Sequence, residues 1–342
     1  MTIKPSLPRT KMLAEAKKSE GHNFLVEIIF FVLVFLVAGI IESIVVAIPM
    51  VSYIFNSEEY KLLVEQYAKQ LIDVNQLTQG VTEITANMPD SITVIMLFAT
   101  VILTLSGLIY CRFIEKRKLA TLGFRKDGAI KEYLVGMLVG TGIFSLAVGI
   151  CLVTGALTFE GFCANISWGY IGLFFVGYLL QGMSEEVLFR GYLTVSLSRR
   201  APIAAAVGIS SVGFACAHLS NSGISVLAFI NLTLFGIFAA VYMLKRGNIW
   251  GVCAIHSLWN FVQGNLYGIS VSGMSKSESI MEMSSVASKS LVNGGDFGLE
   301  GGIAVTIVLV LAIVVMLFTK TKQTELADES EDFPKQEAIP AV

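Results

Sequence analysis

The stretch that decides the fold runs from Ile166 to Leu197 and reads ISWGYIGLFFVGYLLQGMSEEVLFRGYLTVSL. It is apolar and long enough to cross a bilayer, and its only charged residues are Glu185, Glu186 and Arg190. A charge in the hydrocarbon layer costs at least a few kcal/mol, so it usually has a partner and a function. Helical residues four apart share a face, which predicts a pair between Glu186 and Arg190. Glu185 is turned by about 100° from Glu186, so the sequence predicts that it is free to act.

The composition of the whole chain is that of a membrane protein. Of the 342 residues, 54% are hydrophobic and only 15% are charged, and the mean hydropathy is +0.72. The net charge of -2 argues against a nucleic-acid partner. The five cysteines show no CxxC spacing, which predicts neither a disulfide framework nor a cysteine-based metal site.

Apolar runs of about 20 residues recur along the chain, and they predict an all-α bundle of about eight transmembrane helices. The predicted spans are Phe24 to Met50, Ile92 to Tyr110, Tyr133 to Thr154, Ile166 to Leu197, Ala201 to His218, Ile224 to Leu244, Ile249 to Tyr267 and Gly301 to Phe318. Glycines in the third span predict faces on which helices pack closely. The polar loop from Ser52 to Asp90 has an amphipathic middle, typical of a short surface helix. The sequence shows no strand pattern and no soluble domain.

Basic clusters alternate along the chain with acidic or neutral loops. They precede the first predicted span and follow the second, fourth, sixth and eighth. The positive-inside rule therefore predicts a multi-pass protein of the cell membrane with both termini in the cytoplasm. In this organisation residues 1–22 form a basic cytoplasmic segment, residues 23–319 form the transmembrane domain, and residues 320–342 form an acidic tail predicted to be disordered.

Two of the three histidines lie in apolar runs and are candidates for a site inside the membrane. His218 ends the fifth predicted span, and His256 shares a helical face with Asn260, four residues later, in the seventh. A lone histidine of this kind is more often a packed core residue. At about 1.5 Å per helical residue, Glu185, His218 and His256 lie about 20, 25 and 14 Å from the cytoplasmic arginines. The three side chains can therefore meet in one layer.

Two chemistries fit these residues. In the first, Glu185 and His218 hold a water molecule and act as general base toward a peptide carbonyl, while His256 and Asn260 donate hydrogen bonds to the oxyanion. In the second, His218, His256 and Glu185 bind zinc, which lowers the pKa of a bound water toward about 7. The zinc-binding HExxH motif and a conventional serine or cysteine triad are both absent from the sequence. The cofactor is therefore zinc or none.

Three motifs occur in the order and spacing of a known family. EExxxR is present from Glu185 to Arg190, FxxxH from Phe214 to His218, and HxxxN from His256 to Asn260. With these motifs the sequence resembles the CPBP family, which contains CAAX prenyl endopeptidases and the Abi-like bacteriocin-processing and self-immunity proteins. The resemblance covers about residues 112–267.

The resemblance implies an eight-helix intramembrane endopeptidase that cleaves prenylated or other membrane-associated peptides near their C-terminus. It implies Glu185 as the base with His218, and His256 and Asn260 as oxyanion donors. Glu186 and Arg190 would then position the helix. The expected partners are the lipid bilayer and a membrane-embedded or lipidated peptide. The family has been described both as metalloproteases and as glutamate proteases, and the sequence leaves this open.

Two functions of other classes compete with the enzyme. One is a non-catalytic membrane adaptor or immunity protein that regulates a sensor kinase or a bacteriocin system. The other is an ion- or proton-coupled transporter, in which buried Glu and His form a relay. The sequence shows no inverted repeat of broken helices of the kind found in many transporters. The complete motif set favours the enzyme, because an adaptor does not need matched Glu, His and Asn side chains in the membrane.

Overall fold

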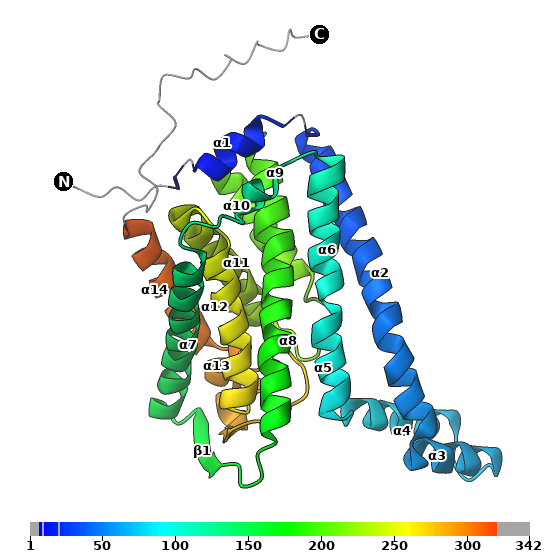
Figure 1. The fold of residues 1–342 in the computed structure, drawn as a ribbon. Coiled ribbons are helices and arrows are strands. Elements are labelled where there is room, and N and C mark those ends of the chain that lie inside the picture. Colours follow the sequence, from blue (N-terminus) through cyan, green and yellow to red (C-terminus); the bar gives the residue numbers. More distant parts are fainter. Residues whose placement is uncertain (1–6, 9, 20, 320–342) are drawn as a thin grey trace, which may run out of the picture.

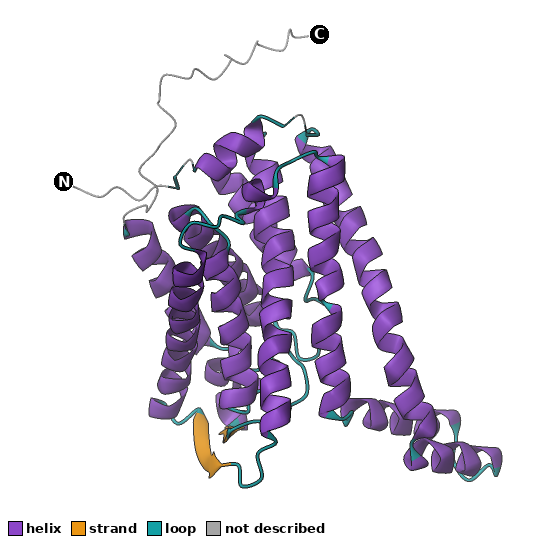
Figure 2. Ribbon diagram, in the orientation of Figure 1, coloured by secondary structure: helices purple, strands orange, loops and turns teal. Residues whose placement is uncertain are grey.

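The computed structural model describes residues 7–8, 10–19 and 21–319, which fold into a bundle of long helices with shorter elements at both ends (Figures 1 and 2). The bundle helices are α2 (Phe24–Asn56), α5 (Asp90–Ala99), α6 (Val101–Ile109), α7 (Ala129–Val153), α8 (Trp168–Glu186), α10 (Ile203–Cys216), α11 (Val226–Arg246), α12 (Trp250–Phe261) and α14 (Ile303–Phe318). Three π-helical segments extend some of them: η1 (Tyr110–Ile114), η3 (Val187–Thr194) and η4 (Val262–Leu266). The short helices are α1 (Lys11–Lys17), α3 (Glu58–Ala68), α4 (Val74–Ala86), α9 (Val195–Ser198) and α13 (Ser290–Asn293). The 3₁₀ turns are η2 (Leu119–Leu122), η5 (Ala287–Lys289), η6 (Gly295–Phe297) and η7 (Leu299–Gly301).

Each predicted span coincides with one helical segment of the bundle. Five segments are long and apolar enough to cross a membrane, namely Phe24–Asn56, Asp90–Ile114, Ala129–Val153, Trp168–Ser198 and Val226–Arg246. α10 and α14 are apolar but shorter. The prediction of an all-α, multi-pass membrane bundle is confirmed.

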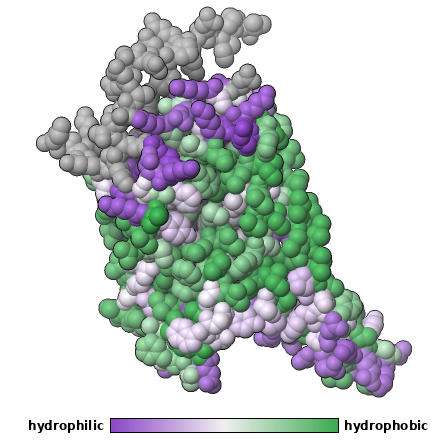
Figure 3. All heavy atoms as spheres, in the orientation of Figure 1, coloured by the Kyte–Doolittle hydropathy of each residue, from purple (hydrophilic) through white to green (hydrophobic). Residues whose placement is uncertain are grey.

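The two ends of the bundle differ in composition. We call the end that carries α1 and residues 115–128 and 199–202 the basic end, and the opposite end, where β1 lies, the sheet end (Figure 1). A broad hydrophobic band separates hydrophilic residues at the two ends (Figure 3). The chain enters α2 and leaves α14 at the basic end, which agrees with an even number of crossings. The predicted acidic tail, residues 320–342, lies outside the described residues.

A small sheet corrects the expectation that the chain forms no strands. β1 (Leu157–Phe162) pairs antiparallel with β2 (Met281–Ser285), with an irregularity between Phe159 and Gly161. Both strands do alternate apolar and polar residues, but only over about four positions, which is too short a signal to recognise beside the membrane spans. The strands pair because folding brings together two segments that are far apart in the sequence.

The predicted surface helix between the first two spans is a pair of helices, α3 and α4, at the sheet end (Figure 1). α4 begins with a capping box, in which Asp73 and Gln76 bond each other's backbone N–H groups. Leu63 of α3 packs over Gly80 of α4. None of the residues in either helix is buried, so this pair lies outside the core.

α12 lies tightly between two neighbouring helices. A Cβ atom at Gly140 of α7 would lie 2.4 Å from the carbonyl oxygen of Ile255, and one at Gly182 of α8 would lie 2.6 Å from the backbone nitrogen of Ser257. Only glycine permits such close backbone approach. Gly136 of α7 also contacts α12, whereas an added Cβ atom at Gly142 or Gly149 would meet nothing within 4 Å. The predicted packing role therefore holds for two of the four glycines of α7. The first two contacts are made to Ile255 and Ser257, the residues on either side of His256, and they fix the backbone at that position.

A group of buried charges ties the basic end together. This basic-end charge cluster consists of Glu27, Glu115, Arg117 and Arg199. Arg199 binds Glu27 at 2.5 Å and also binds Glu115. Arg117 Nε donates to Glu115 at 2.6 Å. Glu27 lies at the start of α2, Glu115 directly follows η1, and Arg199 directly follows α9. The cluster therefore joins these three segments.

Candidate active site

The segment from Ile166 to Leu197 changes from α-helical to π-helical geometry directly after Glu185 and Glu186. Glu185 and Glu186 end α8, and the π-helix η3 follows, with all eight of its residues buried. π-helical turns are rare and occur frequently at functional sites. The sequence predicted an ordinary helix here, yet the predicted pair forms: Arg190 Nη1 lies 3.0 Å from Glu186 Oε1. The guanidinium carbon of Arg190 also lies 4.4 Å from the centre of the Phe214 ring, a cation–π contact.

Glu186 has a second partner that the sequence did not predict. Its Oε1 atom lies 2.8 Å from Nδ1 of His256 on α12, as well as 3.0 Å from Arg190. An ionised carboxylate only accepts hydrogen bonds, so His256 Nδ1 is the donor. The other ring nitrogen, Nε2, lies 3.7 Å from Glu185 Oε2. Glu186 therefore orients His256 toward the neighbouring glutamate.

His218 approaches the same carboxylate from the end of α10. Its Nδ1 atom lies 2.9 Å from the carbonyl oxygen of Phe214, and since a carbonyl can only accept, Nδ1 carries the proton. In the neutral ring Nε2 then has a free lone pair, and this atom lies 4.0 Å from Glu185 Oε2. One carboxylate oxygen thus faces Nε2 atoms of two histidines.

Gln181 holds the other oxygen of Glu185. Its Nε2 atom donates to Glu185 Oε1 at 2.6 Å, and its Oε1 atom accepts from Asn260 Nδ2 at 2.9 Å. Glu185 Oε2 has no hydrogen-bond partner among the described residues. The sequence analysis gave Gln181 no role, although its i,i+4 spacing to Glu185 was a usable signal. The glutamine fixes the carboxylate and leaves its other oxygen buried, without a hydrogen bond and facing the histidines.

The four residues predicted to carry out the chemistry line one cavity. Glu185, His218, His256 and Asn260 all contribute to its wall, although they come from three different helical segments. The side chains of Glu185 and His218 are 17% and 14% exposed, so both can be reached from the cavity. Glu42 of α2 also interacts electrostatically with Glu185. The structure therefore brings together the whole predicted set.

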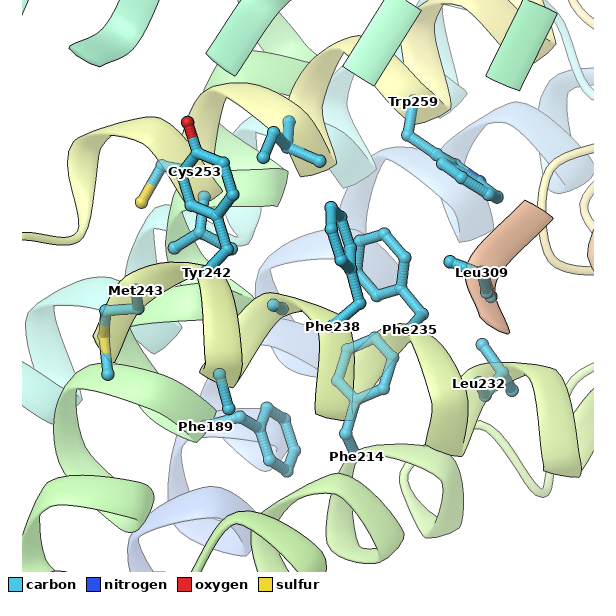
Figure 4. Packing of buried hydrophobic residues seen from close by; sticks show 14 of the residues in the cluster. Phe189, Phe214, Leu232, Phe235, Phe238, Tyr242, Met243, Cys253, Trp259 and Leu309 are labelled. Atoms are coloured by element: carbon cyan, nitrogen blue, oxygen red, sulfur yellow. The ribbon is translucent and has the colours of Figure 1, made fainter. Parts of the chain in front are cut away.

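Aromatic rings form one wall of this cavity and fix the histidines. The ring of Phe235 lies 4.9 Å from the ring of His256 and 5.4 Å from that of Trp259, both in edge-on contacts. Phe214 packs 4.7 Å from the ring of His218. Phe214, Phe235 and Trp259 all line the cavity, and Figure 4 shows the three rings in one region of the core. Such contacts restrict rotation of the imidazoles, because neighbouring rings fill the space around them.

The cavity has a further polar group that the sequence analysis missed. Glu300, just before the eighth predicted span, is 7% exposed and lines the cavity. Its Oε1 atom accepts a hydrogen bond from Trp259 Nε1 at 3.2 Å. The sequence carried little signal for it, because Glu300 lies in a glycine-rich connection without helical or strand periodicity.

Zinc binding by His218, His256 and Glu185 stays a prediction for the part of the chain that the structure describes. No group of three His, Cys, Asp or Glu side chains there has an arrangement able to hold a metal ion. The contact of His256 Nδ1 with a carboxylate is one that zinc-ligating histidines also make, but it is equally suited to orienting a catalytic imidazole. All five cysteines are free thiols.

A comparison with known families agrees with this geometry. Residues 167–262 match the family model described as type II CAAX prenyl endopeptidase Rce1-like. The matched region runs from the start of α8 to the start of η4 and contains all three motifs. The chain therefore carries an Rce1-like domain, and the predicted resemblance to the CPBP family of intramembrane proteases is confirmed. No curated protein and no solved structure matches the chain.

Proposed function

We propose that the protein is an intramembrane endopeptidase that cleaves prenylated or other membrane-associated peptides near their C-terminus, with Glu185 as the base. The observation that carries this proposal is the position of Glu185 Oε2. It faces Nε2 of His218 at 4.0 Å and Nε2 of His256 at 3.7 Å, while Gln181 binds the other oxygen. A carboxylate oriented in this way can accept a proton in a site that water can enter.

The first step is activation of a water molecule. Water between Glu185 Oε2 and His218 Nε2 donates one hydrogen to each, because the lone pair of His218 Nε2 is free in the neutral ring. As the water oxygen attacks the peptide carbonyl, its proton passes to Glu185. Glu185 later delivers this proton to the leaving amine when the C–N bond breaks. His218 orients the water throughout.

The second requirement is stabilisation of the oxyanion that forms on the peptide. Asn260 uses one N–H of its amide on Gln181, which leaves the second for the oxyanion. His256 donates its Nδ1 proton to Glu186, so its Nε2 atom can donate only when the imidazole is doubly protonated. Both donors then act where negative charge develops.

The lining of the cavity suits a hydrophobic substrate. Apolar side chains of α5, α11 and α14 face the polar groups across the cavity, namely Leu97, Leu232, Val305 and Leu309. A lipid group or an apolar peptide segment can occupy such a surface while its backbone carbonyl reaches Glu185. This lining supports a membrane-embedded or lipidated peptide as the partner, and it does not distinguish a prenyl group from another apolar chain.

The orientation in the membrane follows from the charges at the two ends. By the positive-inside rule the basic end faces the cytoplasm, and both termini lie on that side of the cell membrane. The segment 270–296 at the sheet end then lies outside. Reporter fusions within residues 270–296 and after Val342 are expected to report opposite sides, and the same side for both would contradict this orientation.

The direct test is cleavage of a library of membrane peptides, with and without a prenyl group, by the purified protein in liposomes. We expect cleavage near the C-terminus that persists when a chelator is added. Loss of cleavage with the chelator, together with zinc in the purified protein that disappears in His218→Ala, would support the zinc chemistry instead. A protein that cleaves no peptide, and whose cellular role survives Glu185→Gln, would be a non-catalytic adaptor.

A further inference from the structure

Glu300 joins the catalytic helix α12 to a part of the chain beyond the matched region. Its Oε1 atom accepts from Trp259 Nε1 at 3.2 Å. Its Oε2 atom accepts from both the backbone nitrogen and the hydroxyl of Ser272, each at 2.7 Å, and Gln263 Nε2 lies 3.4 Å away. Trp259 and Gln263 belong to the helical segment that carries His256, while Ser272 lies in the connection that follows it.

Residues 268–302, which we call the sheet-end segment, form a fixed wall of the cavity. Gln263 Nε2 donates to the carbonyl of Ser270 at 2.6 Å, and Asn221 Nδ2 donates to that of Ser272 at 2.9 Å. At Gly298 the backbone has φ +94°, and a Cβ atom there would lie 2.0 Å from the carbonyl oxygen of Ser270. This glycine is required both for its conformation and for the close approach. The segment is therefore held to η4 by Gln263 and to the turn after α10 by Asn221.

The backbone of Glu300 is fixed as firmly as its side chain. Asn231 Nδ2 donates to the carbonyl oxygen of Glu300 at 2.7 Å and to that of Gly302 at 2.9 Å. One donor, Trp259, binds Oε1 of Glu300, and three donors from Ser272 and Gln263 lie around Oε2. Both oxygens of Glu300 are thus held by hydrogen bonds, in contrast to Glu185, whose Oε2 has no partner among the described residues.

A line of contacts leads from Glu300 to the candidate oxyanion donors. Trp259, which donates to Glu300, lies next to Asn260 in the sequence and is 1% exposed. Its ring packs 5.4 Å from that of Phe235 (Figure 4). The Phe235 ring in turn packs 4.9 Å from that of His256. A rotation of the indole would therefore move the ring that supports the imidazole.

We propose that Glu300 is a positioning residue: by holding Trp259 against the sheet-end segment, it fixes the orientation of His256 and Asn260. This inference rests on the proposed function for its kinetic consequences. It predicts that Glu300 affects the rate of the chemical step more than substrate binding, because its carboxylate is bound to Trp259 and Ser272.

The kinetic test compares Glu300→Gln with Trp259→Phe and the double variant. Trp259→Phe keeps an aromatic ring and removes the N–H donor, so it tests the same contact even if Glu300→Gln fails to fold. We expect each change to lower kcat by about 10-fold with KM within about 2-fold, and the double variant to lower it by clearly less than the product of the two losses, since both changes weaken the contact between Glu300 and Trp259. Glu132→Gln is the matched control: it alters a buried glutamate that binds Arg246 at the basic end and is expected to leave kcat per folded molecule unchanged.

A second measurement does not depend on cleavage. The chain has three histidines, so ¹³C labelling at Cε1 gives three imidazole signals in an NMR spectrum. Glu300→Gln and Trp259→Phe are expected to shift the signal of His256 and leave that of His22, which lies at the basic end. An unchanged His256 signal, an unchanged kcat, additive losses in the double variant, or a raised KM with normal kcat would each overturn the inference. Absence of cleavage by the wild-type protein would instead overturn the proposed function, while the NMR shifts would still test the position of His256.

Discussion

Two groups of buried charges lie in this molecule, and their partners differ. In the basic-end charge cluster each carboxylate binds an arginine: Glu115 binds Arg117 and Arg199, and Glu27 binds Arg199. Behind the cavity wall Arg190 binds Glu186, whereas Glu185 in the cavity meets one amide and two imidazoles. Arg117 and Arg199 hold Glu115 in its charged form, which makes it a poor base. Glu185 has partners that can themselves gain or lose protons, which suits proton transfer.

The two groups also differ in access. The side chains of Glu27 and Glu115 are fully buried, whereas Glu185 is 17% exposed and lines the cavity. A closed cluster of opposite charges can join helices but cannot meet a substrate. A buried charge is therefore not by itself a sign of function. The type of partner and the access to solvent distinguish a structural cluster, as at the basic end, from a candidate active site, as around Glu185.

The largest expected effect on stability comes from Arg199→Ala in the basic-end charge cluster. This change leaves Glu27 and Glu115 buried with one cation fewer, so we expect a loss of about 3–5 kcal/mol in the free energy of unfolding. Thermal unfolding in detergent measures this loss, and turnover per folded molecule should stay normal. A variant as stable as the wild type would show that the cluster is not structural.

The next effect concerns the cavity. Asn260→Ala removes one candidate oxyanion donor, and we expect a loss of about 10²–10³ in kcat with little change in stability. Asn248→Ala is the matched control, because Asn248 is also buried but bonds the backbone at the start of α12, outside the cavity. Equal kinetic losses in the two variants would contradict a specific role for Asn260.

A smaller effect is expected at Gln181, which joins Glu185 to Asn260. Gln181→Leu keeps the size of the side chain and removes both hydrogen bonds, so both residues lose orientation while the base and the donor remain. We expect kcat to fall by about 10-fold, as measured in the same cleavage assay. A normal kcat would mean that Glu185 is oriented by other contacts.

Local patterns in the sequence were sufficient to predict much of the site. The apolar runs located the helices, because each span must be long enough and apolar enough to cross the bilayer. The i,i+4 spacings predicted the pair of Glu186 with Arg190 and the common face of His256 and Asn260. The high cost of polar groups in lipid predicted that they would meet, and the structure brings them to one cavity.

Contacts between distant segments could not be predicted in the same way. The bond from Glu186 to His256 joins α8 to α12, and the π-helix η3 has no recognised spacing signal in this sequence. Glu300 and the strand β2 lie in a Ser-, Gly- and Met-rich connection without a clear periodicity. Their positions depend on tertiary contacts, such as the close approach at Gly298, which only the folded chain defines.

The central claim is that Glu185 works as a base whereas the other buried glutamates hold the structure together. The most direct test compares Glu185→Gln with Glu132→Gln in the cleavage of a membrane-peptide library. The account predicts that Glu185→Gln lowers cleavage by about 10²–10⁴-fold with an unchanged unfolding temperature, because the amide keeps the shape of the side chain and cannot take a proton. It predicts that Glu132→Gln lowers the unfolding temperature and leaves turnover per folded molecule normal. Cleavage by Glu185→Gln at the wild-type rate would contradict the account.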